Sequence, residues 1–145
     1  MPTRIARTQW SGGLQDGSGQ VELVSSGVGT FDVSFPRRAA DNAGGVTSPE
    51  ELIAAAHSSC YCMQLSAVIG DAGGNVKSLV ADAEVGLGPD PAGGFRITGI
   101  TLTVRGQVDG LDAAGFAEAA QTAKETCPVS KALTGVEISL DAALA

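Results

Sequence analysis

The sequence has little positive charge and few aromatic side chains. Nine Lys and Arg residues stand against sixteen Asp and Glu residues, which leaves a net charge of −7. A chain this acidic repels phosphate backbones, so nucleic acid is not expected as a partner. Aromatic residues make up only 4% of the chain, so Ala, Val, Leu and Ile must fill the core. A chain of 145 residues can bury a hydrophobic core large enough to fold without a structural metal or disulfide bonds. This length also predicts one domain, residues 1–145.

Long apolar segments are also missing from the chain. No apolar h-region follows residues 1–5, which argues against a secretory signal peptide. No uninterrupted apolar run reaches the roughly 18 residues that a membrane span needs. We therefore expect a cytoplasmic protein that has no membrane partner.

Only three cysteines occur, Cys60, Cys62 and Cys127. An odd, small number in a cytosolic chain argues against a structural disulfide framework. Cys60 and Cys62 would point about 200° apart on a helix, so they make a poor pair. Cys127 precedes Pro128, where one helix ends and another begins, and that location lowers a thiol pKa. Cys60 with Cys127 is the better candidate redox pair, although all three could instead be small buried hydrophobes.

Hydrophobic periodicity predicts an α+β fold with the order β-β-β-α-β-β-α-β and antiparallel sheets. A polar loop is expected over residues 37–46. A helix capped by Asp112 should run to about Thr126, and Pro128 should start a short helix to Leu133. The expected strands are residues 4–10, 20–24, 30–35, 78–87 and 95–108, with a last strand from Val136.

The strongest local signals mark a long central helix. Ser48 is a good N-cap, Pro49 suits the first helical position, and Glu51 completes a capping box. The helix should reach about Ile69, and its interior from Leu52 to Ile69 has no charged residue except for a possible charge on His57. A helix with apolar or small side chains on every face is expected to be buried. We expect it to lie between two sheets or in a dimer core.

A reactive Cys60 in an apolar helix needs a cation, because burial raises a thiol pKa. Arg37 and Arg38 in the preceding loop are candidates, although they could equally be surface charges. Glu50 lies about 15 Å along the helix from Cys60, so it could serve that thiol only from a second subunit or across a helix break. Otherwise Glu50 favours the helix dipole. His57 shares a helix face with Cys60 and could form an ion pair with it, but a satisfied core histidine is the commoner explanation.

No metal or cofactor is expected. Cys60, Cys62 and His57 do not converge on a helix as zinc ligands must. The glycine pairs at residues 12–13 and 44–45 match no phosphate-binding loop. No Ser-His-Asp arrangement is visible either.

Residues 48–60 read SPEELIAAAHSSC and residues 123–130 read AKETCPVS. These two segments resemble motifs of the OsmC/Ohr family of organic hydroperoxide reductases, in its OsmC branch. The opening Trp-Ser-Gly of residues 10–12 also fits, and the resemblance covers essentially the whole chain. It implies an OsmC-like fold and an intertwined homodimer with active sites at the subunit interface. It also implies that the protein reduces organic hydroperoxides, and hydrogen peroxide less well, with two cysteines.

The resemblance also assigns roles to individual residues. Cys60 matches the peroxidatic cysteine, and Cys127 matches the resolving cysteine. Glu50 matches the family's motif acid, which pairs with an arginine. That arginine resembles Arg38, with Arg37 as a rival.

On this resemblance, the Cys60 thiolate becomes a sulfenic acid, condenses with Cys127 and is regenerated by a dithiol of the dihydrolipoamide type. Cys62 departs from the family pattern and is expected to be inert. The protein would then act in oxidative or osmotic stress defence. The alternatives are a redox sensor or stress-related binding module on the same dimeric scaffold, and a structural dimer with inert thiols.

Overall fold

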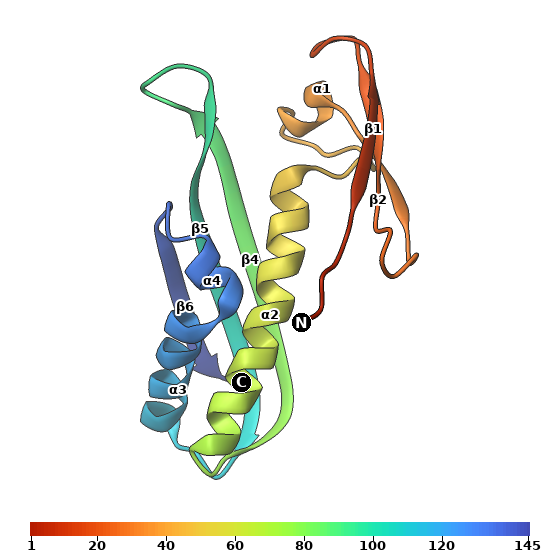
Figure 1. Cartoon of the computed structure of the whole chain (residues 1–145). Coiled ribbons are helices and arrows are strands. Elements are labelled where there is room, and N and C mark those ends of the chain that lie inside the picture. Colours follow the sequence, from red (N-terminus) through yellow and green to blue (C-terminus); the bar gives the residue numbers. More distant parts are fainter. The chain divides into compact units, whose positions relative to one another are not determined.

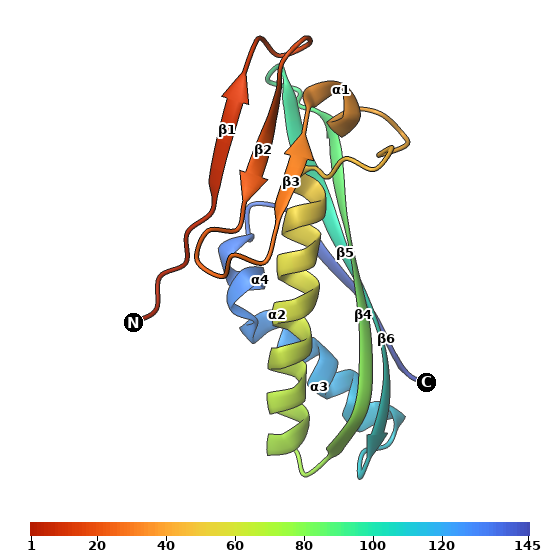
Figure 2. The ribbon, with the colours of Figure 1, turned by 90° about the vertical axis from the view of Figure 1, so that its right-hand side faces the viewer.

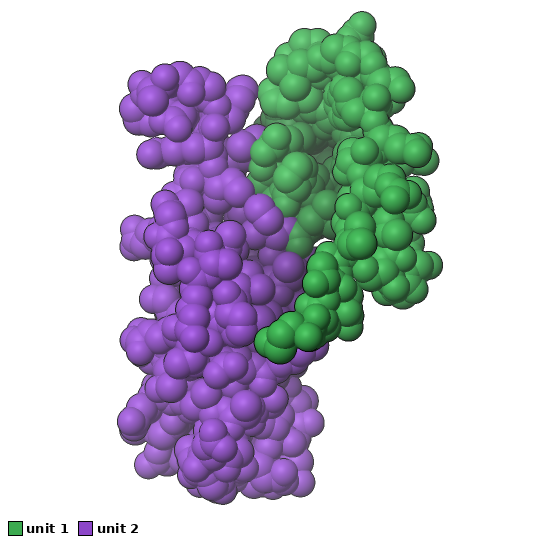
Figure 3. Space-filling view, in the orientation of Figure 1, with its two compact units in different colours: residues 1–52 green, residues 53–145 purple.

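The computed structural model describes all 145 residues. The chain forms two compact units, residues 1–52 and residues 53–145, which are coloured separately in Figure 3. Each unit contains one three-stranded sheet. The elements, labelled in Figures 1 and 2, are β1 (Arg7–Ser11), β2 (Ser18–Glu22), β3 (Thr30–Val33), α1 (Phe35–Arg38), α2 (Pro49–Asp71), β4 (Asn75–Pro89), β5 (Phe95–Asp109), α3 (Ala113–Thr126), α4 (Pro128–Ala132) and β6 (Ile138–Leu144).

The sheet of residues 1–52 is an antiparallel meander in the order β1-β2-β3. The three strands were expected from the sequence, within a few residues at their ends. The short helix α1 was not expected, because residues 30–35 read as one strand and residues 37–46 as a loop. The strand instead ends at Val33, Ser34 is extended, and Pro36 lies in the first helical turn. Proline suits that position, but a four-residue helix is too short to show periodicity.

Helix α2 begins where the sequence predicts and extends to Asp71. The Ser48 hydroxyl accepts a hydrogen bond from the backbone N–H of Glu51 at 3.2 Å, as an N-cap should. The second half of the expected capping box does not form. The Glu51 carboxylate accepts from the hydroxyl of Thr47 instead of from the backbone of Ser48.

Only one face of α2 is buried in the single chain. Its fully buried side chains within residues 53–145 are His57, Tyr61, Leu65 and Ile69. The opposite face is exposed, and its residues are Ala55, Ala56, Ser59, Met63, Ser66, Ala67 and Gly70. The expectation of a helix buried all round is therefore wrong for one chain, because small side chains also fit an exposed face.

By length and composition, α2 could also cross a membrane. A criterion of uninterrupted apolar runs overlooks this helix, whose average hydropathy remains apolar despite His57 and several serines. Tyr61, Leu65 and Ile69 nevertheless pack into the core cluster of the chain. We therefore describe α2 as a core helix.

The core of residues 53–145 lies between the sheet of β4, β5 and β6 and the helices α2 and α3 (Figures 1 and 2). Strands β4 and β5 form a long antiparallel hairpin in which Ala81 pairs with Val104. Asp112 caps α3 by accepting from the backbone N–H of Gly115 at 2.8 Å, as the sequence predicts. The buried β5 and α3 side chains are those that periodicity predicts: Ile100, Leu102, Val104, Phe116, Ala119, Ala120 and Ala123.

The second sheet is mixed, which corrects the expectation of purely antiparallel sheets. Strand β6 pairs with β5 in parallel, and Leu102 lies opposite Leu140. Helices α3 and α4 connect these two strands and return the chain to the end from which β5 started. A parallel pair requires such a crossover, whereas a short turn would give an antiparallel pair.

Candidate functional site

Two sulfur atoms lie close together in the core of residues 53–145. Cys60 is on α2 and Cys127 is at the junction of α3 and α4, and their Sγ atoms are 3.3 Å apart. Both are free thiols, because a disulfide bond is only about 2.05 Å long. Cys62, the third thiol, is also free and forms no hydrogen bond to either of them. The structure thus brings together the pair that sequence reasoning favoured.

The position of Cys127 follows from the proline after it. A residue before proline is driven out of the helical region, and Cys127 has φ −58° and ψ 124°. Its N–H still closes α3 by donating to Ala123 at 2.8 Å, while Pro128 opens α4. The fully buried sulfur of Cys127 therefore lies beside the first turn of α4.

The two thiols have opposite pKa shifts. Burial is the main cause that raises the pKa of Cys60, and the neighbouring Cys127 raises it further. Burial also acts to raise the pKa of Cys127, but hydrogen bonding to the backbone N–H of Ser130, then to the Cys60 thiol, the Ser130 hydroxyl and the backbone N–H of Val129, outweighs it and lowers that pKa. The lowered pKa agrees with the location of Cys127 at a helix start. If Cys60 is to attack first, it needs a positive charge that its own helix does not supply.

Residues 1–52 contain a tight ion pair. The guanidinium of Arg38 donates from Nε to both carboxylate oxygens of Glu50, at 3.0 and 3.2 Å, and from Nη2 to Oε1 at 2.7 Å. The Glu50 side chain is only 9% exposed and that of Arg38 is 33% exposed. The Arg37 guanidinium lies against Gly44 instead. Of the two candidate arginines, Arg38 is the one that pairs with Glu50.

An apolar cavity of about 510 Å³ lies beside Arg38 within residues 1–52. Its walls come from the first sheet, from α1 and from the first turn of α2. The apolar side chains that line it include Trp10, Leu14, Val21, Val33, Phe35 and Leu52. Such a cavity suits an apolar group whose polar end faces the guanidinium.

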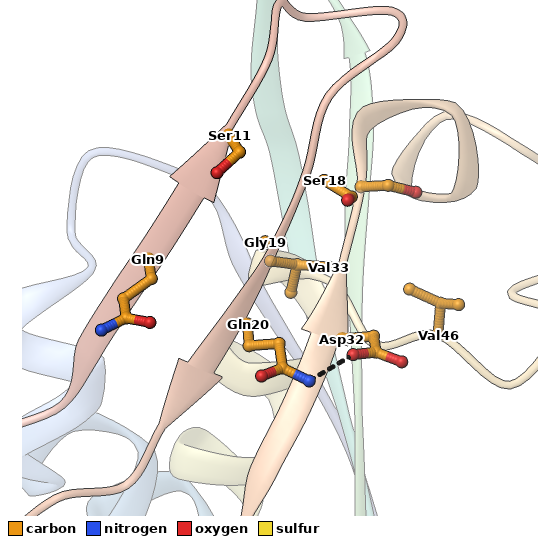
Figure 4. A pocket seen from close by; sticks show the side chains of 9 residues that line it. Gln9, Ser11, Ser18, Gly19, Gln20, Asp32, Val33 and Val46 are labelled. Atoms are coloured by element: carbon orange, nitrogen blue, oxygen red, sulfur yellow. Dashed lines mark hydrogen bonds between the residues drawn. The ribbon is translucent and has the colours of Figure 1, made fainter.

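A second hollow, on the first sheet, is polar and is shown in Figure 4. Gln20 donates from Nε2 to Oδ1 of Asp32 at 2.9 Å across it. It contains no cysteine, histidine or arginine, so it offers neither a thiol nor a cation. No group of three His, Cys, Asp or Glu side chains is arranged to hold a metal ion.

His57 does not pair with Cys60. Its Nε2 lies 2.7 Å from the hydroxyl of Ser130, a residue that sequence reasoning missed. The two lie 73 positions apart, so only the tertiary fold reveals the contact. The Nδ1 atom of His57 is buried and has no hydrogen-bond partner, so this is not a fully satisfied core histidine.

His57 should make the protein less stable in mild acid. Burial lowers the pKa of His57 below its ordinary value of 6.5, so the unfolded chain binds this proton more readily than the folded chain. The contribution to stability is complete above pH 6.5 and is lost as the pH falls toward the lower pKa of the folded state. Urea unfolding at about pH 7.5 and about pH 5.5 should show a larger loss in the wild type than in His57→Gln. An equal loss in both proteins would contradict this assignment.

Comparisons with known proteins cover nearly the whole chain. Residues 42–141 match the family model described as OsmC-like protein. The chain is 39% identical to "Peroxiredoxin OsmC" of Escherichia coli over 93% of this chain and 92% of that protein. It is 33% identical to an "Organic hydroperoxide resistance protein" of Xanthomonas axonopodis over 74% and 75% of the two chains. A crystal structure of an organic hydroperoxide resistance protein OsmC from Legionella pneumophila aligns with a TM-score of 0.79 at 28% identity, covering 99% of this chain and 98% of that one. The sequence match and the shared fold together show that this chain belongs to the OsmC-like protein family, whose relatives carry peroxide-related redox names.

Proposed function

We propose that this protein is a thiol peroxidase that reduces organic hydroperoxides to alcohols. The observation that supports this most directly is the pair of free thiols, Cys60 and Cys127, with their sulfur atoms 3.3 Å apart. Two thiols at this distance can form a disulfide after a small movement, and they can be reduced again.

The proposed reaction has three steps, and atoms and electrons balance in each of them. The Cys60 thiolate attacks one peroxide oxygen, the O–O bond breaks, and the departing alkoxide takes up a proton to become an alcohol. The Cys60 sulfenic acid then condenses with the thiol of Cys127, which forms the S–S bond and releases water. An external dithiol, of the dihydrolipoamide type on the family resemblance, restores both thiols and is itself oxidised.

Accessibility favours Cys60 as the residue that meets the peroxide. Cys60 is partly exposed, whereas Cys127 is fully buried. The lower pKa of Cys127 then suits the second step, in which the resolving sulfur must attack as a thiolate. Cys62 has no part in either step.

Arg38 would supply the positive charge that the Cys60 thiolate needs, and Glu50 would orient its guanidinium through the bidentate pair. Because Glu50 and Cys60 lie ten residues apart along α2, a rise of roughly 15 Å, we propose that the Arg38–Glu50 pair of one subunit serves Cys60 of the other. The exposed, small and apolar face of α2, with Met63 at 71% exposure, supports a homodimer that covers it.

The apolar cavity beside Arg38 supports a preference for hydroperoxides with organic tails over hydrogen peroxide. The two curated relatives are named for peroxide-related roles, which agrees with defence against oxidative or osmotic stress. On this proposal residues 1–145 act as one domain, in the cytoplasm, without metal or cofactor.

Steady-state consumption of cumene hydroperoxide with dihydrolipoamide, compared with consumption of hydrogen peroxide, tests the proposal. We expect sustained turnover with a higher kcat/KM for the organic substrate. A single oxidation of Cys60 without turnover would instead favour the redox sensor or binding role on the same fold.

A further inference from the structure

A buried chain of polar groups leads from α2 to the sulfur of Cys127. His57 Nε2 lies 2.7 Å from the hydroxyl of Ser130 on α4. Ser130 lies three residues after Cys127 in the first turn of α4, and both its backbone N–H and its hydroxyl lower the pKa of the Cys127 thiol. His57 and Cys127 are fully buried, and Ser130 is nearly so. Water therefore does not compete with these hydrogen bonds.

Packing alone does not account for His57. Its Nδ1 atom is buried without a hydrogen-bond partner, and an unpaired buried polar atom destabilises the folded state. An apolar side chain of similar size would fill the same space without that cost. The contribution of His57 must therefore lie in its other nitrogen, which contacts Ser130.

The direction of the hydrogen bonds follows from the unpaired Nδ1. A neutral imidazole carries one proton, and burial lowers the pKa of His57, which keeps it neutral. A proton on Nδ1 would leave a buried N–H donor with no acceptor, so the proton belongs on Nε2. Nε2–H then donates to the Ser130 oxygen, which leaves the hydroxyl hydrogen of Ser130 free to donate to the sulfur of Cys127.

We propose that His57 and Ser130 are positioning residues that hold the Cys127 sulfur ready to attack oxidised Cys60. This inference rests on the proposed function, in which Cys127 is the resolving cysteine. In that step the S–S bond forms and the S–O bond of the sulfenic acid breaks. The Cys60 sulfur is reduced and the Cys127 sulfur is oxidised. The proton lost by Cys127 balances the one that the leaving hydroxide needs to become water.

The hydrogen bond from Ser130 favours the thiolate, because a donor to an ionised acceptor is stronger than a donor to a neutral one. The other titratable groups that act on these thiols within residues 53–145 are Cys60 and Tyr61. Burial raises the pKa of Tyr61, whose hydroxyl donates to the carbonyl of Ala120 at 3.0 Å, so it stays neutral. No charged side chain of this unit therefore takes the place of the Ser130 hydroxyl.

The test measures the pKa of Cys127 by pH-dependent alkylation in a Cys60→Ser/Cys62→Ser background, where Cys127 is the only thiol. We expect Ser130→Ala to raise that pKa by roughly one unit. Ser130→Thr retains the hydroxyl and should restore a value near that of the unmodified background. An unchanged pKa in Ser130→Ala would overturn the proposal.

Two further variants separate positioning from general structural damage. His57→Leu should raise the Cys127 pKa in the same direction, and combining it with Ser130→Ala should add nothing, because His57 acts through Ser130. Additive shifts would contradict the relay. Thr126→Val is the matched control, since it removes the neighbouring hydroxyl that binds Gln64 and should leave the pKa unchanged. If His57→Leu fails to fold, the Ser130 variants still decide the question.

Failure of this inference can be told apart from failure of the proposed function. With all cysteines present, Ser130→Ala should form the Cys60 sulfenic acid at the wild-type rate and convert it to the disulfide about tenfold more slowly at neutral pH. Wild-type turnover with normal resolution in Ser130→Ala would reject the relay alone. Absence of wild-type turnover would reject the peroxidase, whatever the alkylation profile of Cys127.

Discussion

Cys60→Ser is expected to abolish hydroperoxide consumption, with a loss of at least ~1,000-fold in kcat/KM. A serine hydroxyl cannot form the sulfenic acid, and the buried Cys127 cannot meet the peroxide in its place. Cys62→Ser is the matched control, because Cys62 lies on the same helix and forms no hydrogen bond to either of the other thiols. That variant should keep activity close to the wild-type value, measured by peroxide loss under saturating dithiol.

Cys127→Ser should behave differently from both variants. It retains the attacking sulfur, so one equivalent of hydroperoxide should be reduced and the Cys60 sulfenic acid should accumulate, detectable by a dimedone-type trap. Equal losses in Cys60→Ser and Cys62→Ser would refute the assignment of Cys60. Trapping of sulfenic acid at Cys62 would show that Cys62, and not Cys60, is the cysteine on α2 that reacts with the peroxide.

Arg38→Ala is expected to give the second largest effect, a loss of about 10- to 100-fold in kcat/KM. An adjacent cation lowers the pKa of an anionic group by about one to three units, so its removal reduces the fraction of Cys60 that is thiolate at neutral pH. The apparent pKa of Cys60, measured by alkylation, should rise accordingly. Activity should recover in part at higher pH, because base restores the thiolate.

Arg37→Ala is the control, since Arg37 lies next in the chain but does not pair with Glu50. It should leave both the Cys60 pKa and the activity nearly unchanged. Arg38→Lys keeps the charge without the bidentate geometry and should fall between the two. If Arg37→Ala raises the Cys60 pKa and Arg38→Ala does not, the choice of arginine is wrong.

The long elements could be predicted because their signals are local. Ser48 and Pro49 mark the start of α2, and Asp112 marks the start of α3, because the first turn of a helix has backbone N–H groups that need partners. The alternation in β5 predicts its buried face for a similar reason, since side-chain direction in a strand depends only on position.

Features that depend on distant parts of the chain could not be predicted in this way. The parallel pairing of β6 with β5 depends on how α3 and α4 return the chain, and the hydrophobic pattern of β6 is the same for either direction. The exposed face of α2 was missed because small residues such as Ala55 and Ala56 fit both a core and a surface.

The residues of the candidate site also differ in whether local sequence or only the tertiary fold identifies them. Cys127 was a candidate because Pro128 breaks the helix beside it, which is a local fact. The pairing of Arg38 with Glu50 was expected only through the family resemblance, and the resemblance left Arg37 as a rival. Ser130 is the last residue of the second motif and was given no role, because a serine in the first turn of a helix is ordinary until His57 is known to lie against it.

The proposed function requires that Cys60 and Cys127 react with each other after a hydroperoxide oxidises Cys60. The most direct test treats the reduced protein with one equivalent of cumene hydroperoxide and maps the linked peptides by mass spectrometry without reductant. We expect a mass loss of two hydrogen atoms and a single Cys60–Cys127 cross-link that dihydrolipoamide reverses. A cross-link through Cys62, or oxidised Cys60 that never joins Cys127, would contradict it.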